Sequence, residues 1–133
     1  MARIEWAQLC ELAFLDNCDR LCLVGITTRF PVPSLPLAVN QLMIAVRVAD
    51  VRPGDSIELG VSMQTPSGLS TAPDQPDGLQ VTLAAEYVLI TLRQVPLTEE
   101  GIYRFSVSLG PDETVVLDVP VLRTSRPMHA EIH

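Results

Sequence analysis

The fold of this chain is decided by the stretch Ile90–Phe105, which reads ITLRQVPLTEEGIYRF. Apolar residues at Ile90 and Leu92 lead to an acidic pair and Gly101, after which Tyr103 and Phe105 begin a new alternation. Residues that alternate with a period of two line one face of a β-strand, and glycine permits the positive φ that a tight turn needs. The stretch therefore predicts two strands joined by an acidic, glycine-containing turn.

The same stretch resembles the region between strands E and F of immunoglobulin domains, where an acidic-x-Gly turn precedes Tyr and then Cys. This resemblance implies an all-β, immunoglobulin-like β-sandwich of about seven to eight strands. It also implies that Tyr103 forms a tyrosine corner, in which the hydroxyl bonds a backbone group upstream. Phe105 stands where the family has its second Cys, and the only tryptophan, Trp6, lies on the first segment. We expect packing of Phe105 to replace the missing inter-sheet disulfide.

Further runs with period two occur at 56–64, 80–87 and 102–109, and each predicts a half-buried strand. Turn residues separate the strands at short intervals, which favours a sandwich or a barrel. These turn signals lie at 16–19, 52–55 and 110–113.

Two stretches are predicted to be loops, namely 31–36, which carries three prolines, and 64–78, which has no periodicity. Residues 5–15 are open to two interpretations, because Trp6, Leu9, Cys10 and Ala13 share a helical face. The β character of the neighbouring chain favours a strand there. A single β-sandwich domain spanning 1–133 is the resulting prediction.

The composition indicates which kinds of binding partner to expect. Charged residues make up only 19% of the chain, so apolar surface should remain after the core is filled. We expect that surface to be covered by a second copy, as a homodimer, or by another protein. The net charge of −7 and the scattered arginines argue against nucleic acid and against an anionic membrane surface.

The first residues contain Glu5, Gln8 and Glu11, which interrupt any apolar stretch of signal-peptide type. The cytoplasm is therefore the expected compartment. Three cysteines fit that expectation, because an odd number in a reducing space predicts buried free thiols and no disulfide framework. These cysteines are Cys10, Cys18 and Cys22, of which the last two form a CxxxC pattern with no second half.

Acidic residues occur in two turns. Asp16, Asn17 and Asp19 could begin a calcium site, but a hairpin turn with side-chain capping is the simpler interpretation. Glu99 and Glu100 could suggest paired carboxylates for acid–base chemistry. They also sit where the immunoglobulin pattern has its acidic turn, so a structural role suffices.

The two histidines occur in the pattern His129-x-Glu131-x-His133, which could bind a metal or could be a solvated tail. No motif of a hydrolase, phosphate-binding loop or metalloprotease is present. We therefore assign no catalytic, cofactor or metal residue, and expect the protein not to be an enzyme.

Across nearly its full length the chain resembles a family of short uncharacterised bacterial proteins, a domain-of-unknown-function family. The segments 13–17, 20–21 and 24–26 and the pair Pro53-Gly54 carry this resemblance, which implies no activity and no site. The first hypothesis is a non-enzymatic interaction or structural module that acts through its surface and self-associates. The alternatives are a small-ligand or metal-binding sandwich that uses its end loops and, with less support, a hydrolase.

Overall fold

The computed structural model describes residues 3–50, 59–71, 79–84, 86–110 and 113–124, and its regular structure is entirely β. The strands are β1 (Arg3–Leu15), β2 (Leu21–Ile26), β3 (Phe30–Val32), β4 (Leu37–Ala49), β5 (Leu59–Gln64), β6 (Ser70–Thr71), β7 (Leu79–Ala84), β8 (Tyr87–Leu97), β9 (Gly101–Leu109) and β10 (Glu113–Arg123). Strands β3 and β6 have three and two residues, and the eight longer strands agree with the predicted number. Within these residues no helix is long and apolar enough to cross a membrane.

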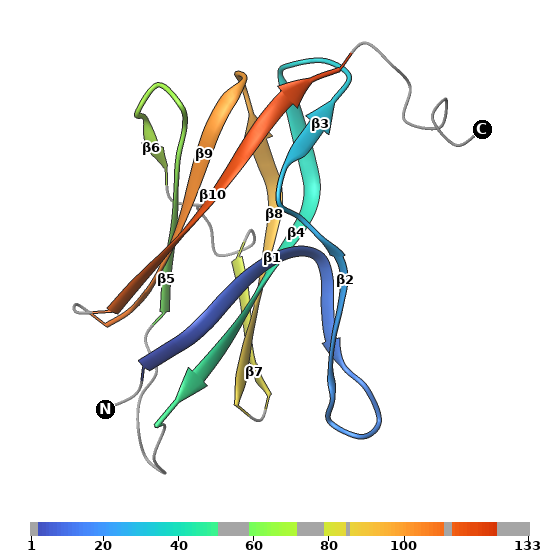
Figure 1. Cartoon of the computed structure of the whole chain (residues 1–133), viewed down its shortest axis with the longest axis vertical. Helices are drawn as coiled ribbons and strands as arrows, with labels where there is room; N and C mark the ends of the chain where they lie inside the picture. The colour runs from blue at the N-terminus through green and yellow to red at the C-terminus, as the bar shows by residue number, and fades with distance from the viewer. Residues whose placement is uncertain (1–2, 51–58, 72–78, 85, 111–112, 125–133) are drawn as a thin grey trace.

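The strands form two five-stranded sheets that face each other (Figure 1). Sheet A has the order β2-β1-β4-β8-β7, and sheet B has the order β3-β10-β9-β5-β6. The segment β1-β4-β8-β7 matches the A-B-E-D sheet of an immunoglobulin domain, and β10-β9-β5 matches G-F-C. This strand order confirms the immunoglobulin-like sandwich. Strand β2 lies outside the position of strand A and is an addition to that pattern.

The main core lies between the sheets and follows the predicted alternation. In β9 the residues Tyr103, Phe105, Val107 and Leu109 are all buried, as the period of two predicts. Phe105 lies within this core, in agreement with its expected packing role. No disulfide links the two sheets, because the three cysteines are free.

A second, smaller apolar cluster lies on the outer face of sheet A. It explains why every residue from Leu42 to Val46 of β4 is buried, although β4 is a strand with two faces. Leu42, Ile44 and Val46 belong to the main core, whereas Met43 and Ala45 belong to the outer cluster. The buried members of this outer cluster are Cys10, Ala13, Met43, Ala45 and Leu89.

The tyrosine corner is present. The Tyr103 hydroxyl accepts hydrogen bonds from the backbone N–H groups of Thr98 (2.9 Å) and Glu99 (3.1 Å), and its ring is fully buried. Gly101 has φ +130°, and a Cβ there would lie 2.6 Å from the Cβ of Pro66. Both the conformation and the space therefore require glycine at this position.

Residues 5–15 form a strand, because they lie within β1, which pairs with β4 from Arg3 to Cys10. The prediction that 31–36 is entirely a loop is wrong, because Pro31 lies in β3, which pairs with β10 in parallel. The Val32 carbonyl accepts from Thr124 N on that side, so the backbone of Pro31 points away from β10. A proline is tolerated on such an edge.

Two other expectations need correction. The prediction that 64–78 lacks regular structure is wrong at Gln64, which ends β5, and at Ser70–Thr71, which forms β6 and pairs with β5; residues 72–78 lie outside the described residues. The run 80–87 was expected to be one strand, but Tyr87 begins β8 and pairs back with Ala84 of β7. Pairing of the two strands determines this reversal, and no Gly, Pro or Asn marks it in the sequence. The turn at 52–55 and the start of the 56–64 run lie outside the described residues.

The corner gives a test of the fold. Tyr103→Phe should lower the free energy of unfolding by about 1–3 kcal/mol, because two partly buried N–H groups lose their acceptor. Tyr103→Ala should cost more, about 3–5 kcal/mol, because it also leaves a cavity. Urea denaturation would measure both values. Tyr87→Phe is the control, since Tyr87 is half-buried on the outer face, and equal effects of the two Phe variants would contradict the corner.

Candidate interaction surface

The first two strands form an arm, defined here as residues 11–26. Strand β1 pairs with β4 only as far as Cys10, opposite Met43, and beyond that point its partner is β2 alone. Figure 1 shows this hairpin curving away from β4 and from sheet B. A two-stranded hairpin is marginally stable by itself, so the arm depends on what packs against its faces.

Asp16 organises the turn of the arm. One carboxylate oxygen accepts from the backbone N–H groups of Cys18 (2.8 Å) and Arg20 (2.9 Å), and the other accepts from Arg20 Nε at 2.7 Å. Asp19 adopts φ 59°, the left-handed conformation that Asp tolerates in turns. These contacts confirm the hairpin interpretation of the segment, and they already occupy the oxygens that calcium would need. The N–H groups of Arg20 and Cys18 hold the pKa of Asp16 below its usual value.

The two faces of the arm differ. Ala13, Leu21 and Leu23 pack into the outer cluster, where the N–H of Ala13 lies 3.2 Å from the sulfur of Met43. The opposite face carries Leu12 and Val24, which are paired across the arm and are 42% and 48% exposed. Phe14 (41% exposed) lies on the same face, and Ile26 (57% exposed) lies opposite Cys10 at the base of the arm. Exposed apolar side chains that gather in one place mark an interaction site more often than scattered ones do.

An aromatic group lies on the outer face of sheet A, next to the outer cluster. The rings of Trp6 and Tyr87 have centroids 6.1 Å apart, and the guanidinium of Arg47 lies 6.0 Å from the Tyr87 centroid. Arg47 also pairs with Glu86 (3.3 Å) and Glu5 (3.6 Å). Trp, Tyr and Arg are the residue types that contribute most often to binding energy in protein interfaces.

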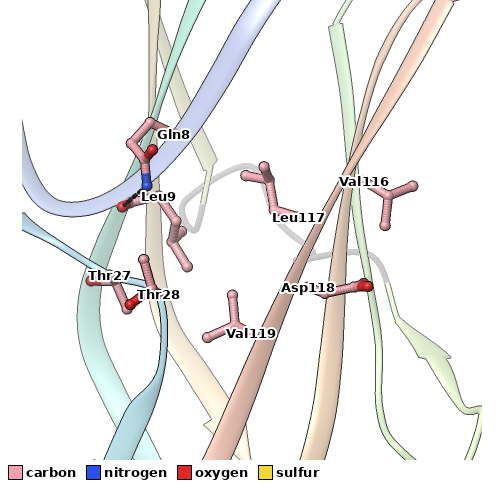
Figure 2. A pocket seen from close by; sticks show the side chains of 8 residues that line it. All are labelled: Gln8, Leu9, Thr27, Thr28, Val116, Leu117, Asp118 and Val119. Carbon is pink, nitrogen blue, oxygen red and sulfur yellow. Dashed lines mark hydrogen bonds between the residues drawn. The ribbon is translucent and has the colours of Figure 1, made fainter.

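A cavity of about 200 Å³ opens along the side of the sandwich, between β1 and β10. Figure 2 shows Leu117 and Val119 on the side of β10 that faces Leu9, whereas Asp118 points away. Ligand pockets usually enclose about 300–1,000 Å³, so this cavity is small. The alternative of a ligand-binding sandwich places the site in the end loops, whereas this cavity lies along the side of the sandwich. The cavity is lined by Gln8, Leu9, Thr27, Thr28, Val116, Leu117, Asp118 and Val119.

The expectation of three buried thiols is correct only for Cys10. Cys18 is exposed and Cys22 is partly exposed. Cys18 lies in the turn of the arm, and Cys22 lies on β2, opposite Phe14. Both are outside the region where the arm meets the outer cluster. Burial raises the pKa of the Cys10 thiol, which makes this thiol still less reactive.

Glu99 and Glu100 have structural partners. Glu99 Oε2 accepts from the Ser67 hydroxyl at 2.8 Å, and Glu100 Oε1 accepts from the N–H of Arg123 at 2.7 Å. The two carboxylates therefore tie the corner turn to the β5–β6 hairpin and to the end of β10. This arrangement supports the structural interpretation of the pair.

The remaining metal candidate, His129-x-Glu131-x-His133, lies outside the described residues. Among the residues that the structure describes, no group of three His, Cys, Asp or Glu side chains could hold a metal ion.

The turn of the arm can be tested by pH. Asp16→Ala should lower the melting temperature at neutral pH, and this deficit should shrink as the pH falls. The reason is that a carboxyl whose pKa is lowered by folding stabilises the protein above its unfolded pKa of ~3.9, and loses that contribution as the pH falls through its folded pKa. Asp16→Asn keeps an acceptor oxygen and should be milder. A deficit that is independent of pH would contradict this role.

Thiol labelling tests the exposure of the cysteines. With a chromogenic disulfide reagent under native conditions, Cys18 should react first, and Cys10 should react only when the protein unfolds. Cys18→Ser should remove the fast phase. Labelling of Cys10 at the rate of Cys18 would show that the outer cluster opens readily.

Comparisons with known proteins concern the fold and the family. The first immunoglobulin domain of mouse SynCAM 2 is 19% identical, with 67% of this chain and 96% of that chain covered and a TM-score of 0.30. At that score the likeness carries no weight beside the strand order and the tyrosine corner. No curated protein matches the chain in sequence. The family of unknown function DUF6941 matches residues 5–122, and the chain therefore belongs to that family.

Proposed function

We propose that this protein is a non-enzymatic interaction module that acts through its surface and associates with itself, and that the arm is its contact region. The observation that carries this proposal is the exposed apolar side chains of the arm, Leu12, Phe14, Val24 and Ile26. Side chains of this kind gain free energy when they leave water, at about 25 cal/mol per Å².

The absence of charged residues from β2 supports self-association along that part of the arm. Copies of a chain with a net charge of −7 repel each other, so they associate most easily where charges are few. Strand β2 reads LCLVGI and contains no charged residue. The aromatic group around Trp6 and Tyr87 lies on the same sheet and offers a second contact region for a different protein.

Mass in solution tests the proposal. Light scattering after size exclusion should give at least twice the monomer mass of 14.5 kDa at micromolar concentration. Raising the salt concentration should not dissociate the oligomer, because screening acts on charges and this contact is apolar. A monomer throughout the micromolar range would contradict self-association.

A further inference from the structure

Much of one edge of sheet B has no neighbouring strand. Strand β10 runs from Glu113 to Arg123, but β3 pairs with it only at residues 121–123. Over residues 113–120, β9 is the only strand that pairs with β10 among the described residues. The chain arrives at β3 from β2, a strand of sheet A, and comes alongside β10 only at Phe30. Residues 113–120 are called here the β10 edge.

Two hydrogen bonds show which backbone groups the β10 edge offers. Thr124 N donates to Val32 O, and backbone direction alternates along a strand, so the even-numbered residues of β10 point away from β9. On the other side of β9, Thr65 N donates to Leu69 O, so the even-numbered residues of β5 point toward β9. Strand β9 pairs with β5 and with β10 without a shift in register, which gives the same assignment for β10.

The position of Pro120 agrees with this assignment. A proline has no N–H, so it fits a paired strand only where its nitrogen points away from the partner. Pro120 is even-numbered and pairs with Ile102 of β9, so its nitrogen points to the edge. Within the part of the chain that the structure describes, the unpaired N–H and C=O groups of this edge are those of Thr114, Val116 and Asp118.

The cavity between β1 and β10 opens onto the β10 edge. Val116 and Asp118 line this cavity, although their side chains point away from it in Figure 2, so their backbone borders it. Leu117 points toward the cavity and is only partly buried, although its side chain lies on the core face of sheet B. An apolar groove therefore lies directly beside a row of unpaired backbone groups.

We propose that the β10 edge binds an extended segment of another protein, which adds a strand to sheet B. Strand addition of this kind uses a row of unpaired N–H and C=O groups together with pockets for alternate side chains. Thr114, Val116 and Asp118 supply the backbone groups, and the cavity supplies the pocket. Its volume of about 200 Å³ is enough for an apolar side chain, since a cavity of ~150 Å³ holds benzene.

The depth of the β10 edge favours a single segment over a second copy of this chain. The cavity is lined from both sides, so the edge lies inside a groove and not on an open flank. In a second copy the same edge lies equally deep, and two such edges cannot reach the ~4.8 Å spacing of paired strands. A lone extended segment can enter the groove. The lining residues opposite β10 are Gln8, Leu9, Thr27 and Thr28.

Charge gives the second property of the segment. Asp118 lies on the outer face of sheet B, where its carboxylate is 3.4 Å from Arg104 Nε of β9. The added strand would be its other neighbour, and like charges on neighbouring strands are destabilising. The net charge of −7 also repels an acidic segment. The expected partner segment has an apolar residue at every second position and Lys or Arg, not Asp or Glu, among the others.

Amide hydrogen exchange tests whether the edge is free. In the protein alone, the N–H groups of Thr114, Val116 and Asp118 should exchange at least about tenfold faster than those of the residues between them, which bond β9. Equal protection at every protein concentration would show that the chain itself covers the edge. Protection that rises with protein concentration would show that a second copy covers it. Either result would overturn the proposal.

Selection from a library of random seven-residue peptides tests the occupant. Peptides enriched on the unmodified protein should show the expected alternation and charge. Val116→Pro removes one outward N–H but no bond to β9, and should weaken their binding by about tenfold. Val116→Thr is the matched control, because it keeps the N–H and changes only a side chain that points away from the groove. It should bind like the unmodified protein, and circular dichroism should report an intact β fold in both variants.

The remaining outcomes decide the location of the site. If no peptide prefers the unmodified protein over Val116→Pro, or if Val116→Thr loses binding equally, the β10 edge is not the site. A selected peptide should also slow the exchange of the Thr114, Val116 and Asp118 amides. Slowing confined to other residues would place the peptide outside the groove. None of these results affects self-association through the arm, which the mass in solution tests separately.

Discussion

The two hydrogen bonds that the Tyr103 hydroxyl accepts hold together the point at which the chain passes from sheet A to sheet B. They join the end of β8 to the beginning of β9, the central strand of sheet B. The Ser67–Glu99 bond and the close approach of Gly101 to Pro66 bring the β5–β6 hairpin to the same place. Because β5 and β10 both pair with β9, the position of β9 determines that of its neighbours across the core.

The apolar side chains of the described residues lie in three environments. Most of it fills the core between the sheets, where Phe105 packs without the inter-sheet disulfide of antibody domains. A second part forms the cluster on the outer face of sheet A, so that β4 is covered on both sides. The third part is exposed, on the arm and on other strands, as at Ile102, Val116 and Leu122. The arm includes β2, the strand added to the immunoglobulin pattern, so the proposed contact region lies in an element that this pattern lacks.

Local chemistry made several features predictable from the sequence. The alternation from Tyr103 to Leu109 identified a half-buried strand, and the acidic turn with Gly101 identified the corner. The Asp16 turn was predictable because a carboxylate bonds backbone groups only two to four residues away. Other features had no local signal. Nothing between Ala84 and Tyr87 marks a reversal, and the alternation of polar and apolar residues runs through it.

The sequence by itself determined the sandwich class, the tyrosine corner and the turn of the arm, because each depends on residues that are near one another in the chain. Only the tertiary structure decided which apolar residues stay exposed, since burial depends on neighbours that are distant in sequence. Leu23 and Val24 are adjacent and both apolar, yet only Leu23 packs into the outer cluster. Cys10 and Cys18 likewise differ in burial. Cys10 packs beside Met43 of β4 and Leu89 of β8, whereas Cys18 lies in the turn of the arm, beyond the last residue that pairs with β4.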